Sequence, residues 1–501
     1  MPVPSADELN AEPSNVELSR EALVSMLCAI LPEEAVLSQS EELAPYESDG
    51  LPAYREQPLV VCLPETVEQV QQVLALCYEQ RVPVVARGAG TGLSGGALPL
   101  ANGVLLSLAK FTRILEVDTN NCIARVEPGV RNLAISQAVA KHNLYYAPDP
   151  SSQIACSIGG NVAENSGGVH CLKYGLTVHN VLGLKMISMD GELLEIGGAS
   201  LDSSGYDLLA LMHGSEGLLG VIVEVTVKLL PSPECVQVLL AAFDNVVAAA
   251  EVVGEIIADG IVPAGLEMMD GPAIRAAEDF IHAGYPRDAA AILLCEIDGA
   301  EAEVEVQVET IKRLLSTGGA VEILVASEAE DRQRLWAGRK AAFPAVGRLA
   351  PDYYCMDGTI PRRRLAEVLQ KISDWSVEYG LDVVNVFHAG DGNLHPLILY
   401  DANNTGELEQ VEEFGGKILE LCVAVGGTIT GEHGVGVEKL NQMCVQFGEQ
   451  ELLQFHALKD AFDERGLLNP GKAVPTLHRC AEFGALHVHQ GAVPFPDIER
   501  F

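Results

Sequence analysis

Two histidines seven residues apart, His388 and His395, flank a sharp turn in the stretch FHAGDGNLHP. The dipeptide Asp391-Gly392 is typical of a two-residue type I′ hairpin loop, in which both central residues need positive φ. A hairpin centred there pairs His388 directly with His395 and places both rings on one face, with Cβ atoms about 5 Å apart. Two imidazoles at that separation can bind one divalent metal. The alternative is a pair of surface histidines beside a turn, and the spacing alone favours neither.

A first glycine-rich stretch, GTGLSG at 90–95, satisfies the dinucleotide pattern G-x-G-x-x-G. The continuation through Pro99 into a strand excludes the helix that a Rossmann fold requires at this point. What remains is a glycine loop entered from a strand through Arg87. Its backbone N–H groups can surround phosphate oxygens, with the hydroxyls of Thr91 and Ser94 added. The alternative is a flexible surface loop, which five glycines directly after a buried strand disfavour.

A second glycine-rich stretch, residues 148–175, is dominated by small residues, amides and hydroxyls. This composition suits a backbone that wraps closely around a flat, polar, phosphorylated cofactor. Two such loops in one domain are more specific for a cofactor than one loop is.

The chain has 501 residues, which is long enough for two or more domains, and its composition is that of an ordinary globular protein. The formal net charge of −38 argues against a nucleic-acid partner and against electrostatic docking on anionic lipid. An anionic substrate must therefore be held by a local cluster of positive charge.

The acidic N-terminus has no signal-peptide pattern, and the apolar runs are short or interrupted by charge, so we expect no direct membrane insertion. The twelve cysteines stand well apart and form no C-x-x-C pair. We therefore expect a cytoplasmic protein with reduced thiols and no iron–sulfur cluster of its own.

The elements that must position these residues fall into two parts with different patterning. From the strand LVVCL (59–63) to about residue 230, short strands alternate with glycine, proline and asparagine signals. Here Thr66 and Gln69 form a capping box before an amphipathic helix. From about 236, strand-like stretches alternate with long acidic helices, which indicates a second α+β domain.

Three motifs of the first part, RGAGTGLSGGA, PDPSSQIACSIGGNVAENSGG and GSEGLLGVIVEVTVKL, together resemble the FAD domain of the vanillyl-alcohol oxidase/p-cresol methylhydroxylase superfamily. In the second part, HAGDGNLHP, TGEHGVG and ERGLLNPGK resemble the 2-hydroxy-acid branch of that superfamily, which includes D-lactate and D-2-hydroxyglutarate dehydrogenases. The C-terminal stretch RCAEFGALHVH is similar to that of the flavin subunits of bacterial glycolate oxidases. The resemblance covers nearly the whole chain.

This resemblance implies an α+β fold. FAD would lie between the two α+β subdomains of a PCMH-type FAD-binding domain, and a ferredoxin-like domain would cap the isoalloxazine. We expect an N-terminal helical segment (1–55), the FAD-binding domain (56–235), the substrate or cap domain with a C-terminal helical segment (236–475), and an extended tail (476–501).

The resemblance also assigns FAD-binding positions, because in related enzymes the loop at 87–97 holds the pyrophosphate and 150–168 lines the rest of the cofactor. Some relatives attach FAD through a histidine, and His170 and His213 are present, but this branch usually binds FAD non-covalently, as we expect here. The expected FAD-binding residues are Arg87, Gly88, Gly90, Thr91, Gly92, Ser94, Gly95, Gly96, Pro150, Ser151, Ser152, Ser157, Ile158, Gly159, Asn161, Asn165, Gly168, Ile222 and Asn469.

Oxidation of a 2-hydroxy acid removes a proton from the hydroxyl group and a hydride from the same carbon, and flavin N5 accepts the hydride. A metal held by His388, His395 and a carboxylate would acidify the hydroxyl as a Lewis acid. The resemblance supplies Glu432 as the third ligand and His433 as the general base, a role that suits an imidazole. Zn, Mn and Fe all remain open, and a solvated loop pair is the alternative for Glu432 and His433.

The resemblance assigns the substrate carboxylate to Arg339, whose fork-shaped cation can bind it with two hydrogen bonds. Where the hydroxyglutarate branch holds a second carboxylate with polar side chains, this chain has Phe343 and the region of Cys355. We therefore expect a short substrate.

These expectations describe oxidation of a short D-2-hydroxy acid, glycolate to glyoxylate or D-lactate to pyruvate, without NAD. Electrons would pass to a quinone or to partners, of which a second flavin-type subunit and an iron–sulfur subunit are implied by the glycolate oxidase resemblance. Such partners would make any contact with the inner membrane. The alternatives are a stand-alone D-lactate dehydrogenase and, from another class, a non-catalytic flavin-carrying structural subunit, which would not need the metal, base and arginine set.

Overall fold

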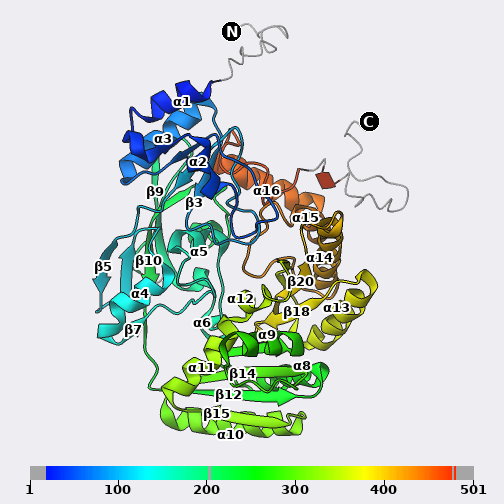
Figure 1. Cartoon of the computed structure of the whole chain (residues 1–501). Coiled ribbons are helices and arrows are strands. Elements are labelled where there is room, and N and C mark those ends of the chain that lie inside the picture. Colours follow the sequence, from blue (N-terminus) through cyan, green and yellow to red (C-terminus); the bar gives the residue numbers. More distant parts are fainter. Residues whose placement is uncertain (1–17, 201–204, 477–478, 481–501) are drawn as a thin grey trace.

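The computed structural model describes residues 18–200, 205–476 and 479–480. The first part of the chain (blue to blue-green in Figure 1) contains two large sheets, as the expected pair of α+β subdomains requires, and a small sheet of β7 (Leu144–Tyr145) with β11 (Leu230–Pro231). The first sheet has the order β1-β2-β4-β3 and is parallel over its last three strands. Its elements are α1 (Arg20–Leu27), β1 (Val36–Leu37), β2 (Val60–Cys62), α3 (Val67–Gln80), β3 (Val84–Arg87) and β4 (Val104–Ser107).

Helix α3 illustrates why the local sequence folds in this way. Thr66 accepts a hydrogen bond from the N–H of Gln69, and the Gln69 side chain accepts one from the N–H of Thr66, which is the predicted capping box. The helix buries Val70, Val73 and Leu74 against the sheet. Strand β3 then leads directly into the glycine loop at Arg87.

The second sheet is antiparallel, with the order β5-β6-β10-β8-β9. The long strand β10 lies at its centre, and helix α5 packs against that strand and begins directly after the second glycine-rich stretch. Its elements are β5 (Ile114–Asp118), β6 (Ile123–Val126), α4 (Asn132–Val139), α5 (Ile158–Glu164), β8 (Val181–Ile187), β9 (Leu193–Gly197) and β10 (Val221–Lys228).

The second part of the chain is built on a seven-stranded sheet with the order β15-β12-β14-β13-β18-β20-β16. Its first four strands, with α8 and α10, form the strand–helix–strand–strand–helix–strand pattern of a ferredoxin-like domain, which confirms that expectation. These elements are β12 (Cys235–Phe243), α8 (Val246–Ala258), β13 (Gly265–Asp270), α9 (Gly271–Ile281), β14 (Ala291–Gly299), α10 (Glu301–Thr317) and β15 (Glu322–Ala326).

Three further strands widen this sheet and end at the candidate site. Strands β18 and β20 form the hairpin that carries His388 and His395, and β16 covers the far edge. The remaining elements are α11 (Ala329–Lys340), α12 (Ala342–Val346), β16 (Asp352–Cys355), β17 (Gly358–Thr359), α13 (Leu365–Tyr379), β18 (Val383–Phe387), β19 (Asn393–Leu394), β20 (Pro396–Tyr400), α14 (Glu407–Ala424), α15 (Leu440–Gln446) and α16 (Glu449–Phe462).

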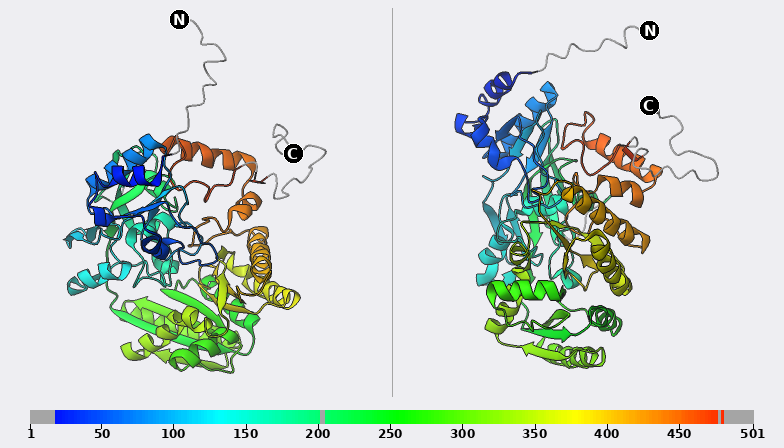
Figure 2. Two further views of the ribbon diagram at one scale, coloured as in Figure 1. Left: turned by 45° about the horizontal axis from the view of Figure 1, so that its top comes forward. Right: turned by 45° about the vertical axis from the view of Figure 1, so that its right-hand side comes forward.

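The chain then returns to its first part, and α16 (orange) lies beside the blue N-terminal elements in Figures 1 and 2. The N–H of Val84 in β3 donates to Leu467 O, and the N–H of Asn469 donates to Val84 O, both at 2.8 Å. Leu468 is completely buried in the core of the first sheet. The division at 235/236 stays a prediction, and this returning segment ties the end of the second predicted domain to the first.

The expectation that all cysteines are reduced is wrong for one pair, because Cys444 and Cys480 form a disulfide with Cα atoms 5.3 Å apart. The two cysteines are 36 residues apart in the sequence, and no local motif indicated that they pair. Beyond Cys480, the predicted extended tail lies outside the described residues. In the described ranges, no helix combines the length and apolar character needed to cross a membrane.

Replacing Leu468 by Ala should lower the free energy of unfolding by about 2–5 kcal/mol, because it leaves a cavity in a fully packed core. Denaturant unfolding of the FAD-loaded protein measures this change. Leu453→Ala, at a position on α16 that is 42% exposed, is the matched control and should cost far less. Equal costs for the two variants would contradict the returning segment.

Candidate active site

A cavity of about 540 Å³ opens where residues from both parts of the chain meet. The glycine loop after β3 forms one wall, and the start of α5 with the turn before β10 forms the next. Residues from the second part close the cavity: Lys340, Phe343, His395, Glu432 and His433.

Most of the expected FAD-binding residues line this cavity. They are Arg87, Gly88, Gly90, Thr91, Gly92, Gly96, Pro150, Ser151, Ser152, Ser157, Gly159, Asn161 and Ile222. Six expected residues do not reach the lining, namely Ser94, Gly95, Ile158, Asn165, Gly168 and Asn469.

Several of these six support the wall from behind. Asn469 Nδ2 donates to Gly96 O at 2.9 Å and to Glu216 O at 2.7 Å, which joins the glycine loop to the turn before β10. Asn165 ends helix α5 with positive φ and accepts the N–H of Val178. Their role is to hold backbone rather than to contact a ligand.

The sequence analysis missed lining residues that carry no obvious pattern. Pro128 belongs to the loop after β6, and Glu164 and Glu216 are acidic residues inside a site predicted to bind phosphates. Glu216 lies within the motif GSEGLLG, which was the available signal, but acidic residues were not sought there.

The cavity has the features that a flat, phosphorylated cofactor needs. The Ser157 hydroxyl precedes α5, is buried and has no hydrogen-bond partner within the described chain, so it can serve a ligand. A Cβ at Gly88 would collide with that hydroxyl, and a Cβ at Gly159 would lie 2.6 Å from Pro128 Cβ. Glycine at these two positions therefore lets the glycine loop, the start of α5 and the loop after β6 pack closely together around the cavity. The residues present fit FAD.

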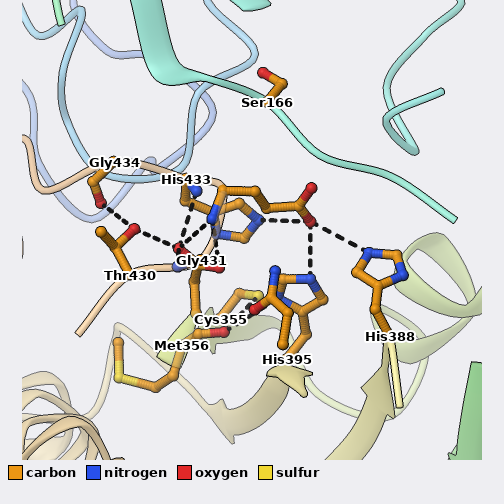
Figure 3. Close-up of polar contacts among 12 residues, drawn as sticks. Ser166, Cys355, Met356, His388, His395, Thr430, Gly431, His433 and Gly434 are labelled. Carbon is orange, nitrogen blue, oxygen red and sulfur yellow. Dashed lines mark hydrogen bonds and ion pairs between the residues drawn. The ribbon is translucent and has the colours of Figure 1, made fainter. Parts of the chain in front are cut away.

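The predicted metal ligands also come together in this wall. His388 Nε2 lies 3.3 Å and His395 Nε2 lies 2.9 Å from Glu432 Oε1 (Figure 3). One donor atom from each of the three residues lies within 4.8 Å of the others, and both histidines are buried. Two imidazoles and a carboxylate are a donor set that suits a divalent metal.

The hairpin that brings the two histidines together differs from the predicted one. His388 lies opposite Asn393, so the loop comprises residues 389–392, and within it only Gly392 has a positive φ, of +84°. The two-residue type I′ loop and the direct pairing of His388 with His395 are therefore wrong. The register is shifted by two residues, which leaves each side chain on its original face. The histidines are diagonal neighbours, with ring centroids 5.2 Å apart.

Contacts with neighbouring segments explain the longer loop. The N–H of Gly390 donates to Leu266 O at 2.9 Å, and the N–H of Ile360 donates to Gly392 O at 3.0 Å. These tertiary hydrogen bonds satisfy backbone groups that a tight turn would leave to water.

Glu432 and His433 lie on an irregular loop that Asp357 holds in place. The buried Asp357 carboxylate accepts the N–H groups of Gly431, Glu432 and His433, at 3.0, 3.2 and 2.9 Å. Lys439 Nζ lies 3.1 Å from Asp357 Oδ2. Burial alone would raise the pKa of Asp357, but Lys439 and His433 hold it well below its ordinary value.

His433 stacks on the ring of His395, with centroids 4.9 Å apart, and its Nε2 lies 3.9 Å from Glu432 Oε1. Burial lowers the pKa of His433 to about 4. The ring is therefore neutral at pH 7 and can accept a proton.

Arg339 does not line the cavity. Its Nε donates to Glu267 Oε2 at 2.9 Å, and its Nη2 lies 2.8 Å from the same oxygen without hydrogen-bonding geometry. Glu267 also bonds to Nδ1 of His388 at 2.7 Å. The guanidinium thus supports a predicted metal ligand from behind, and its predicted contact with a substrate carboxylate stays a prediction. Lys340, the next residue, lines the cavity, as does Arg87 from the glycine loop.

Phe343 lines the cavity and packs edge-on against His395, with ring centroids 6.3 Å apart.

The two histidines considered for covalent flavin attachment lie elsewhere. His170 is held between Asp149 and Glu296, and His213 bonds to Leu209 O. Neither lines the cavity.

Comparison with known proteins identifies the families to which the two parts of the chain belong. Residues 58–197 match the FAD binding domain family, and residues 232–473 match the family of FAD linked oxidases, C-terminal domain. The chain is 64% identical over 485 residues to the glycolate oxidase subunit GlcD of Escherichia coli strain K12, covering 97% of each chain. It is 35% identical to the D-lactate dehydrogenase of Archaeoglobus fulgidus, covering 83% of this chain and 92% of that relative.

The fold has solved counterparts. The structure of p-cresol methylhydroxylase with substrate bound aligns with a TM-score of 0.78 over 91% of this chain and 97% of the other, at 18% identity. A 4-ethylphenol oxidase from Gulosibacter chungangensis aligns with the same TM-score. These likenesses confirm the expected superfamily fold. Together with the two matched domain families, they show that the chain belongs to the FAD-linked oxidases and is an FAD-dependent oxidoreductase.

Proposed function

We propose that the chain oxidises a short D-2-hydroxy acid, with glycolate or D-lactate as the substrate. The observation that carries this proposal is the position of His395, Glu432 and His433 on the wall of the same cavity that the FAD loops line. Relatives named glycolate oxidase subunit and D-lactate dehydrogenase support the substrate class. A non-catalytic flavin-carrying subunit would not need this constellation.

His433 is the proposed general base. Its Nδ1 is buried without a partner in the described chain, whereas Nε2 faces the carboxylate of Glu432, so Nε2 is the atom proposed to take the proton of the substrate hydroxyl. A neutral ring at pH 7 is ready for this step. Stacking on His395 fixes the plane of the ring. When bound, FAD supplies the acceptor for the two electrons that leave the substrate carbon.

His388, His395 and Glu432 are the proposed ligands of a divalent metal, Zn, Mn or Fe. Bound there, the metal would supply Lewis-acid polarisation of the substrate hydroxyl. Glu267 orients His388 by bonding to its Nδ1, which leaves Nε2 turned toward Glu432.

We propose that Arg339 and Lys340 provide the positive charge that the substrate carboxylate needs in a protein of net charge −38. Lys340 lies on the cavity wall, and Arg339 precedes it in α11, where it is paired with Glu267. Phe343 sets an apolar ring beside His395, where a second carboxylate would lose its hydration without gaining a partner.

FAD is proposed to be bound without a covalent link, because the two candidate histidines lie away from the cavity. Acid precipitation should therefore release all of the flavin into the supernatant, where its absorbance can be measured. Flavin that stays with the polypeptide would contradict this proposal.

For reoxidation we propose transfer to a second flavin-type subunit and an iron–sulfur subunit, since the relative GlcD is named a subunit and the sequence has no C-x-x-C pair. The proposed location is the cytoplasm, with any contact with the inner membrane made by those partners. The second candidate function is a stand-alone D-lactate dehydrogenase, which the relative from Archaeoglobus fulgidus favours.

Substrate size gives the first test of this function. Anaerobic mixing of the FAD-loaded protein with glycolate or D-lactate should bleach the flavin faster than mixing with D-2-hydroxyglutarate, because Phe343 offers no partner to a second carboxylate. Replacing Phe343 by Thr should make the rate of flavin bleaching by D-2-hydroxyglutarate more similar to the rate with the short acids. If D-2-hydroxyglutarate is the fastest substrate, the assignment of this pocket fails.

His388→Ala and His395→Ala should each lower the amount of bound divalent metal and abolish most of kcat. FAD should stay bound, because the flavin loops lie in the other part of the chain. Metal analysis of the purified proteins and flavin absorbance measure the two effects. His142→Ala, an exposed histidine on the FAD half, is the control and should change neither. Full metal content in both variants would leave the two histidines as structural residues only.

His433→Ala should behave differently. It should keep the metal and FAD and lose roughly 10²- to 10⁴-fold in the rate of flavin reduction, which is the usual cost of removing a general base. Stopped-flow reduction with the best substrate measures this rate. A loss of less than tenfold would mean that another group takes the proton.

A further inference from the structure

The loop that carries Glu432 and His433 is held from two sides, by one carboxylate from each half of the molecule. Asp357 on the cap side accepts three N–H groups from residues 431–433. Glu216 on the FAD side accepts the next two: Oε1 receives the N–H of Val435 and Oε2 receives that of Gly436, each at 2.7 Å. Asp357 belongs to the half that supplies the metal ligands, whereas Glu216 does not.

Glu216 is built into the FAD half by contacts that leave its carboxylate fixed. Its side chain is buried, its own carbonyl accepts Asn469 Nδ2 at 2.7 Å, and Asn469 Nδ2 also donates to Gly96 O in the glycine loop. The backbone at Glu216 has a positive φ of +50°, between two positive-φ glycines, Gly214 and Gly217. The sharp turn thus aims one side chain across the boundary at the loop of the other half.

The hydrogen bonds that Glu216 accepts are those of an ionised carboxylate. Both of its oxygens accept short bonds from backbone N–H groups, which is the pattern of a carboxylate. Its neighbour Glu164 accepts no hydrogen bond at the buried Oε2, and burial followed by the charge of Glu216 raises the pKa of Glu164 well above its usual range. Burial raises the pKa of Glu216 above its ordinary value, and the N–H groups of Val435 and Gly436, together with Lys439 and Lys472, oppose that rise.

We propose that Glu216 is a positioning residue for the oxidation: its carboxylate fixes the loop bearing Glu432 and His433 relative to the FAD cavity. The metal ligands depend on Asp357 and on the hairpin, so they keep their mutual arrangement when Glu216 is changed. What Glu216 sets is the placement of that whole group against the cofactor. A displacement of about 1 Å between reacting groups can cost on the order of 10²-fold in rate.

The variant that tests this is Glu216→Gln, in which the amide keeps the size of the side chain but turns an NH2 group toward one of the two backbone donors. Hydrogen exchange of the FAD-loaded protein, without substrate, should become at least tenfold faster at Val435 and Gly436. Exchange at residues 431–433 should change little. Bound FAD and bound metal should stay at native levels.

The same variant, mixed anaerobically with the best hydroxy acid, should show a rate of flavin reduction lowered roughly 10- to 100-fold, with little change in the substrate concentration that gives half of the maximal rate. Glu192→Gln, which alters an exposed acid of the same half, is the matched control and should match the native protein in both measurements. If Glu216→Gln does not fold, Glu216→Asp decides the question, because it keeps the charge and shortens the reach.

Faster exchange at 435–436 with an unchanged reduction rate would overturn the positioning role and leave Glu216 a structural residue. Unchanged exchange would overturn the contact itself. The inference rests on the proposed function only for the rate measurement. If the native protein is reduced by no hydroxy acid, the proposed function fails while the exchange result still reports on the contact.

Discussion

The active site depends on the loop of residues 431–436, which has no regular secondary structure and yet has most of its backbone N–H groups hydrogen-bonded. Residues 431–436 cannot satisfy their own backbone N–H groups, and an unpaired buried N–H costs about 1–3 kcal/mol. Two buried carboxylates, Asp357 and Glu216, accept most of these donors. The cost of burying two anions is offset by these bonds and by Lys439, which is itself completely buried beside Asp357. The positions of Glu432 and His433 follow from that arrangement.

Much of the fold was accessible from the sequence because its signals are local. The capping box at Thr66 and the glycine loop after β3 each depend on residues within one short window, and the structure has both. The ferredoxin-like order of β15-β12-β14-β13 came instead from the family resemblance, because strand order is set by long-range pairing that no window contains. The Cys444–Cys480 disulfide was missed for the same reason.

In the candidate site, too, some residues could be predicted from the sequence, whereas their long-range partners could not. The residues with recognisable chemistry, His388, His395, Glu432 and His433, were named correctly as a group that lies together. The partners that set their geometry were not. Glu267 and Asp357 are single acids in stretches without a pattern, and the motif that contains Glu216 indicated a cofactor and not a hydrogen-bond acceptor. Arg339 shows the consequence: the resemblance predicted a carboxylate clamp, and the unforeseen Glu267 accepts the hydrogen bond of its Nε and lies against its Nη2.

The hairpin has a further implication for how this site tolerates change in chain length. His388 and His395 share a face because the cross-strand register moves side chains between faces with every odd step and returns them with every even one. The predicted and observed turns differ by two residues, and for that reason both bring the rings together. A shift of the pairing by one residue would instead place the two imidazoles on opposite faces of the sheet. An inserted or deleted residue among 389–392 therefore leaves the histidines together only where the loop absorbs the change in length and the pairing of β18 with β20 is kept.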